Sequence, residues 1–162
     1  MLIGILSDTH DRVEAAAAAM RLLRGQNCEF FIHCGDVGNE HVLDCLGGEP
    51  AAFVWGNNDF GEPDLVRYAE RLGIQCLGRF GDLTLDGKRF AISHGDDSRL
   101  VKRLLASQDY DYLLQGHTHV KFDRREGRTR WINPGALYRA TVKTVATLDT
   151  ARDELRFLTV EV

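Results

Sequence analysis

Short apolar runs alternate with longer stretches of mixed polarity through the first half of the chain. The apolar runs at 2–6, 30–32 and 51–54 are predicted to be buried strands. Between and after them, helices are predicted over 12–23, which contains an alanine-rich segment, and over 40–46 and 63–72. This half of the chain is therefore expected to alternate strand and helix.

The second half of the chain is richer in hairpins. Asp86-Gly87 suits a tight two-residue turn, so 83–85 and 89–93 are predicted to pair. A second hairpin is predicted over 120–132 around Glu126-Gly127. The remaining expected elements are one helix and three strands, at 96–106, 110–114, 142–148 and 155–160. Together the two halves predict an α/β fold in which two sheets meet in one core and helices cover the outside.

Local signals indicate where the helices begin. Asp11, followed three residues later by Glu14, is expected to form a capping box for the first helix. Glu62-Pro63 is the expected start of the third helix, because proline is favoured in the first helical turn. Asp96 or Asp97 is the expected N-cap of the fourth helix.

Composition narrows the class of protein. The chain has 162 residues, 44% hydrophobic and 27% charged, which predicts a soluble protein with a single domain spanning 1–162. A net charge of -4 argues against extended nucleic-acid binding, and the first apolar run is too short for a signal peptide or a membrane span. The cysteines are irregularly spaced without a C-x-x-C motif, so reduced, mostly buried thiols in a cytoplasmic protein are expected. They are Cys28, Cys34, Cys45 and Cys76.

Side chains able to bind metal follow the ends of the predicted strands within a few residues. In chain order they are Asp8, His10, Asp36, Asn57, His94, His117 and His119. Residues i and i+2 of an extended segment point the same way, so His117 and His119 can reach one spot. Ligands gather at the carboxyl ends of strands in sheets with helical crossovers. We therefore expect these loops to converge on one crevice.

The chemistry of this donor set indicates which metals it suits. Carboxylates, an amide oxygen and imidazoles fit manganese, iron, nickel or zinc, whereas the absence of a thiolate argues against a structural zinc site. The set is larger than one ion usually takes from protein, but it would hold two ions if one carboxylate bridged them. Asp36 is the natural bridge. Any one motif alone is common in turns, but four of the six histidines fall at expected ligand positions.

The ordered motifs resemble those of the calcineurin-like metallophosphoesterase family. They are Asp8-x-His10, Gly35-Asp36, Gly56-Asn57, His94-Gly95 and Gly116-His117-Thr118-His119. Asn133-Pro134-Gly135 also resembles the end of small bacterial and archaeal members described as phosphodiesterases. The resemblance implies a four-layer α/β/β/α sandwich, in which two stacked mixed sheets are flanked by helices. It also implies two divalent metal ions about 3.5–4 Å apart.

The resemblance further implies a role for each expected ligand. The first ion would be held by Asp8, His10, Asp36 and His119. The second ion would be held by Asp36, Asn57, His94 and His117. Manganese is favoured, with nickel, iron or zinc as alternatives, and Asp36, Asn57 and His94 are the expected catalytic residues.

One position departs from the family pattern. Many members have a histidine directly after the ligand asparagine, where it protonates the leaving oxygen, but this chain has Asn58. An amide cannot donate that proton at neutral pH, and general acid catalysis typically contributes about 10²–10⁴-fold. We therefore expect hydrolysis of small phosphodiesters, or activated phosphomonoesters, by in-line attack of a metal-bridging hydroxide. Asp59 is expected to support the ligands without binding metal.

Two other functions stay open from the sequence. Some relatives with this fold, notably a retromer subunit, mainly bind partner proteins, so a metal-binding scaffold is one alternative. A nucleotide-specific phosphodiesterase is the other, in which Phe60 or Tyr138 could stack on a base or could simply pack. A homo-oligomer is compatible with either. His33 and His41 are expected to be structural. The basic residues expected to be solvated surface are Arg12, Arg99, Lys102 and Arg139.

Overall fold

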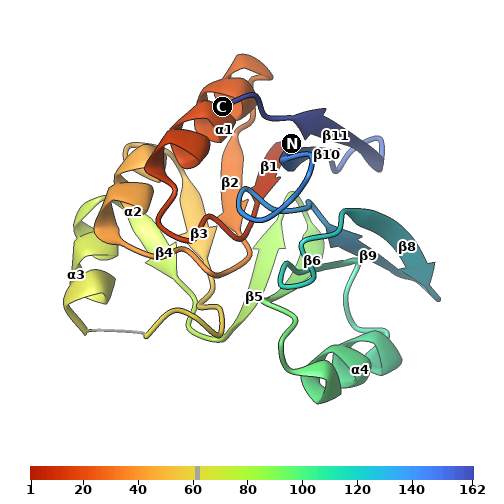
Figure 1. The fold of residues 1–162 in the computed structure, drawn as a ribbon. Coiled ribbons are helices and arrows are strands. Elements are labelled where there is room, and N and C mark those ends of the chain that lie inside the picture. The colour runs from red at the N-terminus through yellow and green to blue at the C-terminus, as the bar shows by residue number, and fades with distance from the viewer. Residues whose placement is uncertain (61–62) are drawn as a thin grey trace.

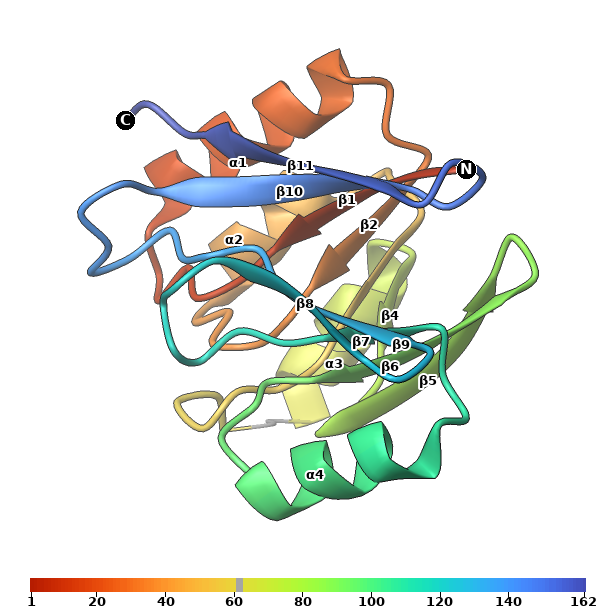
Figure 2. The ribbon, with the colours of Figure 1, turned by 90° about the vertical axis from the view of Figure 1, so that its right-hand side faces the viewer.

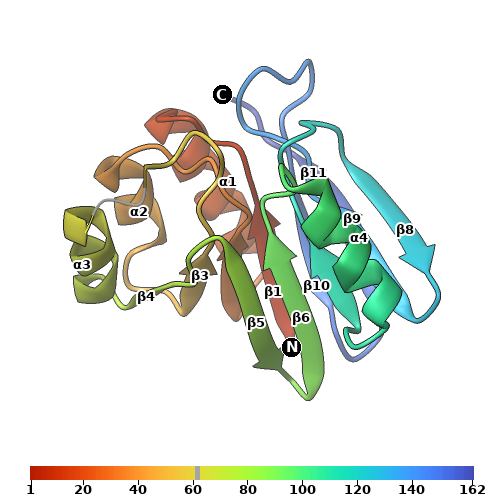
Figure 3. The same cartoon turned by 90° about the horizontal axis from the view of Figure 1, so that it is seen from below.

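Two mixed β-sheets lie face to face, with helices on both outer faces, in a computed structural model that describes residues 1–60 and 63–162 (Figures 1 and 3). The helices are α1 (Val13–Gly25), α2 (Glu40–Leu46), α3 (Pro63–Arg71) and α4 (Ser98–Ser107). The first three cover one sheet, and α4 covers the other (Figure 3). The predicted four-layer sandwich is confirmed.

The first sheet combines parallel and antiparallel strands. Its strands are β1 (Leu2–Leu6), β2 (Phe30–His33), β3 (Ala51–Phe53), β4 (Ile74–Cys76), β10 (Thr144–Asp149) and β11 (Glu154–Thr159). Their order is β11-β10-β1-β2-β3-β4, and the pairs from β1 to β4 are parallel. The antiparallel strands β10 and β11 lie next to β1 (Figure 2). The carboxyl ends of β1, β2 and β3 therefore share one edge.

The second sheet is built mainly from the second half of the chain. Its strands are β5 (Phe80–Leu85), β6 (Lys88–Ser93), β7 (Tyr112–Leu114), β8 (Phe122–Glu126) and β9 (Thr129–Asn133). Their order is β5-β6-β7-β9-β8, with β6, β7 and β9 parallel. The predicted hairpin turn is present, since Leu85 pairs with Lys88 across Asp86 and Gly87. Both turn residues have positive φ, as this tight turn requires.

The hydrophobic core forms three layers between the sheets and helices. In β1, Ile3 and Ile5 face the second sheet, whereas Leu6 faces the helices. This alternation buries both faces of the strand, which is why the parallel strands are apolar along their whole length. Val101 and Leu104 of α4 close the third layer against the second sheet. The core thus fixes the sheet edges that carry the polar loops.

Several element bounds differ from those predicted. The strand β4 has no counterpart among the predicted elements, because three residues are too few for a periodic pattern. It pairs with β3, starting at Ile74 opposite Ala51. β5 begins at Phe80, before the predicted 83, and β7 begins at Tyr112, after the predicted 110.

The predicted capping box of α1 is wrong. The N-cap is Arg12, without a side-chain capping bond, and Asp11 has a φ of 63°. The physical reason is that the backbone N–H groups of His10 and Asp11 donate to the carbonyl oxygens of Asp36 and Val37, which holds the chain in a turn before the helix begins. Asp97 is the N-cap of α4, and its carboxylate accepts hydrogen bonds from backbone N–H groups. Pro63 begins α3 as predicted, whereas Glu62 lies outside the described residues.

The cysteines are all free thiols, but they are less buried than predicted. Cys34 alone is fully buried, in the layer between the sheets, and burial raises its pKa. Cys28, Cys45 and Cys76 are half-buried against the helical layer. Within residues 1–60 and 63–162, none of the helices combines the length and apolarity that crossing a membrane would require.

Candidate metal centre

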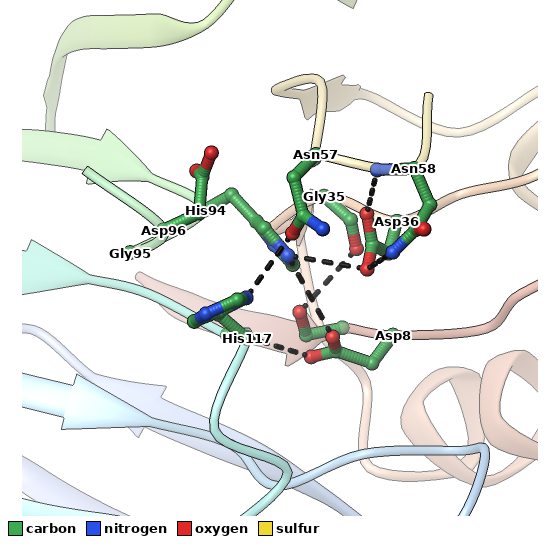
Figure 4. Close-up of polar contacts among 12 residues, drawn as sticks. Asp8, Gly35, Asp36, Asn57, Asn58, His94, Gly95, Asp96 and His117 are labelled. Carbon is green, nitrogen blue, oxygen red and sulfur yellow. Dashed lines mark hydrogen bonds and ion pairs between the residues drawn. The ribbon is translucent and has the colours of Figure 1, made fainter. Parts of the chain in front are cut away.

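The predicted metal ligands meet at one edge of the two sheets. Asp8 follows β1, Asp36 follows β2, and Asn57 follows β3, while His94 and His117 follow β6 and β7 of the facing sheet (Figure 4). His10 and His119 lie at the same place through their contacts with these carboxylates. The expected convergence of the loops is therefore present in the fold.

Asp8 is buried and lies close to several of the other predicted metal ligands. Its side chain is fully buried, and its Oδ1 lies 3.1 Å from Nε2 of His119. The same oxygen is 3.9 Å from Nε2 of both His10 and His94. Its Oδ2 accepts a hydrogen bond of 3.1 Å from the backbone N–H of His117. One carboxylate thus faces imidazoles from three different loops.

Asp36 occupies the centre of the cluster. Its Oδ2 lies 3.2 Å from Nε2 of His10 and 3.3 Å from Nε2 of His94. Asn58 binds both oxygens of the carboxylate, donating its backbone N–H to Oδ1 at 2.9 Å and its side-chain N–H to Oδ2 at 2.8 Å. Asp36 therefore contacts residues of both expected ligand groups, as a bridging ligand would.

Asn57 and His117 form the outer part of the cluster. Both are exposed, and Nδ1 of His117 lies 3.1 Å from Oδ1 of Asn57 (Figure 4). Among the described residues, the ligand atoms of two sets lie within 4.8 Å of one another: Asp8, His10 and His119, and Asp8, Asp36 and His94. The structure thus places Asp8, as well as Asp36, beside His94.

Three buried donor atoms have no hydrogen-bond partner among the described residues: Oδ1 of Asp8 and Nε2 of both His10 and His94. Buried polar atoms are normally paired, so these three require an explanation. Nδ1 of His94 donates to the carbonyl oxygen of Cys34 at 2.8 Å, which leaves the Nε2 lone pair directed toward Asp36. This tautomer is the one that binds a metal. The residues present therefore fit a divalent cation.

Burial and hydrogen bonding set the charge states of the cluster in opposite directions. Burial raises the pKa of Asp8 above its ordinary value, although His94 partly opposes this. Burial would also raise the pKa of Asp36, but the neighbouring His94 imidazole and the hydrogen bonds from Asn58 outweigh it and hold that pKa well below its ordinary range. Burial lowers the pKa of His94, yet the neighbouring carboxylates raise it overall. The cluster thus favours the charged form of the Asp36 carboxylate.

Glycines next to the ligands let the loops approach one another. A Cβ on Gly56 would lie 2.0 Å from Oδ1 of Asp36, and one on Gly116 would lie 2.5 Å from Oδ2 of Asp8. A Cβ on Gly35 would lie 2.6 Å from the His94 ring. Each contact is closer than real side chains allow, so these glycines are required by close packing around the cluster.

Residues outside the ligand set support the loops. The Asp59 carboxylate accepts N–H bonds from Gly56 at 2.8 Å, Gly38 at 2.9 Å and Val37 at 3.1 Å, which ties the second loop to the third. The predicted supporting role of Asp59 agrees with these bonds. Asn133, which the sequence marks only as part of the Asn133-Pro134-Gly135 motif, donates its side-chain N–H to the carbonyl oxygen of Gly116 at 2.7 Å and so holds the last loop. The Asn133-Pro134-Gly135 motif is the sequence signal that could have indicated this role.

The two remaining histidines have different surroundings. His33 is fully buried, its Nδ1 accepts the Gly35 N–H at 3.2 Å, and its Nε2 lies 2.9 Å from Oγ1 of Thr9. Burial lowers the pKa of His33 to about 3. His41 is exposed on α2. The prediction that both are structural agrees with these positions.

The cluster opens into a cleft of about 400 Å³. Its lining residues are His10, Asp36, Asn57, Asn58, His117, His119, Tyr138 and Arg139. Arg139, predicted to be solvated surface, is exposed but forms part of this wall. Arg99 and Lys102, by contrast, lie on α4 as exposed residues.

Comparisons with known proteins identify the family. Residues 1–153 match the family described as the calcineurin-like phosphoesterase superfamily domain. A phosphodiesterase of Methanocaldococcus jannaschii is 30% identical over 166 residues, which cover 99% of this chain and 100% of that protein. A probable metallophosphoesterase of the same organism is 32% identical over 145 residues, 84% of this chain and 68% of that one.

A solved structure described as a novel archaeal phosphodiesterase has the same architecture. It superposes with a TM-score of 0.92 at 28% identity, covering 99% of this chain and 100% of the other. The chain therefore belongs to the calcineurin-like phosphoesterase superfamily. It is a metal-dependent phosphoesterase, a hydrolase that acts on phosphate ester bonds.

Proposed function

We propose that this protein is a phosphodiesterase that uses two divalent cations, with manganese favoured. The proposed ligands of the first ion are Asp8, His10, Asp36 and His119. Those of the second ion are Asp36, Asn57, His94 and His117. The observation that carries the proposal is the group of buried, unpartnered donor atoms on Asp8, His10 and His94.

The proposed chemistry divides between the ions and the chain. Bound divalent cations lower the pKa of water toward neutrality and neutralise phosphoryl oxygens. The chain orients the donors: the Cys34 carbonyl fixes the His94 tautomer, and Asn58 holds both oxygens of Asp36. His117 and Asn57 stand at the mouth of the cleft, where a phosphate ester would enter.

The shape of the cleft favours a diester over a monoester. A second cavity of about 400 Å³ shares Asn58 with the cleft, and a third of about 650 Å³ shares Tyr138 and Arg139 with it. A phosphodiester has two substituents, and the cleft continues in two directions. The amide of Asn58 binds Asp36 and is no proton donor, so ester groups that leave with little protonation are favoured.

The cysteines and the net charge bear on where the enzyme acts. We propose a cytoplasmic protein acting on a small-molecule ester, which the free cysteine thiols and the acidic net charge support. A homo-oligomer stays a prediction. Tyr138, considered for base stacking, is contacted by His10, Arg12 and Arg139 instead. Phe60 is 87% exposed.

The test measures turnover and metal binding on the same protein. Purified protein with manganese should release nitrophenolate from bis(p-nitrophenyl) phosphate, whereas Asp36→Asn should lose at least about a hundredfold in kcat/KM. Glu70→Gln is the matched control, because Glu70 is exposed on α3 away from the cleft. Tight metal binding without turnover of any ester would refute the proposal and favour the scaffold alternative.

A further inference from the structure

A large cavity continues the metal cleft toward the end of the chain. Its volume is about 650 Å³, and it lies between the first turn of α1 and the loop that joins β9 to β10. Tyr138 and Arg139 line both this cavity and the metal cleft. A substituent on a phosphate in the cleft therefore has this space, which we call the basic pocket, as its continuation.

Basic side chains outnumber acidic side chains in the lining of the basic pocket by three to two, and the last residue, Val162, also lines it. Its basic side chains are Arg12, Arg139 and Lys143, and its acidic ones are Asp11 and Glu14. Across residues 1–60 and 63–162, no carboxylate oxygen forms an ion pair within 4.0 Å of any of these three cations. The Asp11 carboxylate instead packs against Gly38, where an added Cβ would lie 2.3 Å from its Oδ1.

Tyr138 holds two of these cations at the boundary between the cleft and the pocket. The guanidinium carbon of Arg12 lies 4.8 Å from the ring centroid of Tyr138, and that of Arg139 lies 5.1 Å from it. Nε of Arg139 also donates to the Tyr138 hydroxyl at 3.0 Å. A guanidinium stacked on an aromatic ring keeps N–H groups at its edge free to bind an anion.

The backbone at Arg139 indicates that this arrangement is imposed by its surroundings. Arg139 has a φ of 49°, a left-handed conformation that few residues other than glycine adopt. Such a conformation costs free energy and persists where the surrounding structure fixes it. The Tyr138 ring is packed against the His10 ring, with centroids 4.9 Å apart. Tyr138, on which Arg139 stacks, is therefore anchored to the metal cluster.

We propose that the basic pocket binds a second phosphate group of the substrate. The substrate class is then a phosphodiester in which one alcohol carries a further phosphate. Planar guanidinium groups pair with phosphate through two parallel hydrogen bonds, and Arg12 and Arg139 are both available for this. A nucleobase suits the pocket less well, because the Tyr138 ring already contacts two guanidiniums and an imidazole. This inference rests on the proposed function.

Two esters that differ by one phosphate test the proposal. They are the p-nitrophenyl ester of a nucleoside 5′-phosphate and the same ester with an added 3′-phosphate, and both release nitrophenolate. For the wild-type protein we expect kcat/KM to be about tenfold higher for the second ester, through a lower KM. Arg12→Gln and Arg139→Gln should each remove most of this preference. Arg103→Gln on α4 is the charge-matched control and should keep it.

A binding measurement on metal-free protein separates this proposal from the proposed function. With chelator present, a nucleoside 3′,5′-bisphosphate should bind the wild-type protein, and the double variant Arg12→Gln, Arg139→Gln should bind it at least about tenfold more weakly. Failure of the manganese-loaded protein to hydrolyse either ester would refute the proposed function alone. The proposal for the basic pocket would be overturned by equal kcat/KM values for the two esters with the wild-type protein. Equal affinity of the wild type and the double variant for the bisphosphate would overturn it too.

Discussion

Replacing the buried carboxylate of Asp8 by an amide should stabilise the metal-free protein and abolish its response to metal. In the wild type, Oδ1 of Asp8 is buried and has no hydrogen-bond partner in the part of the chain that the structure describes. In Asp8→Asn, an amide nitrogen at that position can donate to Nε2 of His119, which lies 3.1 Å away. The Oδ2 position still accepts the His117 N–H. The substitution therefore removes a desolvated charge and keeps the existing bond.

The magnitude follows from the cost of an unsatisfied buried group. That cost is about 1–3 kcal/mol. For a chain of this length, 1 kcal/mol corresponds to a Tm change of about 2–4 °C, so metal-free Asp8→Asn should melt about 2–12 °C higher than the wild type. For an ion with a Kd near 1 μM, 1 mM manganese should stabilise the wild type by about 4 kcal/mol. The same manganese concentration should stabilise Asp8→Asn far less.

Thermal unfolding with chelator and with manganese measures both effects. Asp109→Asn is the matched control, because Asp109 is exposed and such surface changes usually alter stability by less than about 0.5 kcal/mol. The reasoning is refuted if metal-free Asp8→Asn melts below the wild type, or if manganese raises the Tm of both proteins equally.

Three further predictions concern single positions. Asn58→His should raise kcat/KM for alkyl diesters relative to nitrophenyl diesters by at least about tenfold, because it restores a proton donor; an unchanged ratio contradicts this. Gly56→Ala should lose metal and unfold at lower urea, since its Cβ would meet Asp36, whereas Gly25→Ala, with nothing within 4 Å, should gain up to about 1 kcal/mol. Burial lowers the pKa of His33 to about 3, so the stability it contributes is present above about pH 6.5 and is lost as the pH falls toward 3. Urea unfolding of metal-free His33→Gln at pH 5 and pH 7 should therefore show a smaller pH dependence than the wild type, and an equal dependence would count against this.

The sequence predicted the layers and the converging loops because both depend on local patterns. Apolar runs mark strands buried on both faces, and Asp-x-His or Gly-Asp follows them directly. The positions of Tyr138 and Arg139 could not be predicted in this way, because they depend on where the loop between β9 and β10 meets α1. The role of Asn133 was missed for the same reason, since its partner Gly116 is 17 residues away. Contacts between loops carry no periodic signal in the sequence.

The capping box wrongly predicted at Asp11 shows that the sequence pattern does not predict the backbone conformation of these loops. Five expected ligands have positive φ: Asp8 at 55°, His10 at 43°, Asp36 at 54°, His117 at 67° and His119 at 58°. Aspartate and histidine tolerate this region better than most residues, but each instance still costs free energy. Nothing in the local sequence signals this conformation, so the pattern at Asp11 predicts an ordinary helix start that the backbone does not adopt.

This strain is held by bonds that do not depend on a metal. The Asp59 carboxylate ties three backbone N–H groups together, and Asn133 holds the loop that carries the last two histidines. The apolar layers fix the strand ends from which the loops begin. These bonds fix the donor loops without using a metal ligand, so cation binding need not supply the whole ordering free energy of the loops. For that reason the unpartnered atoms at Asp8, His10 and His94 are better understood as a prepared binding site than as a packing defect.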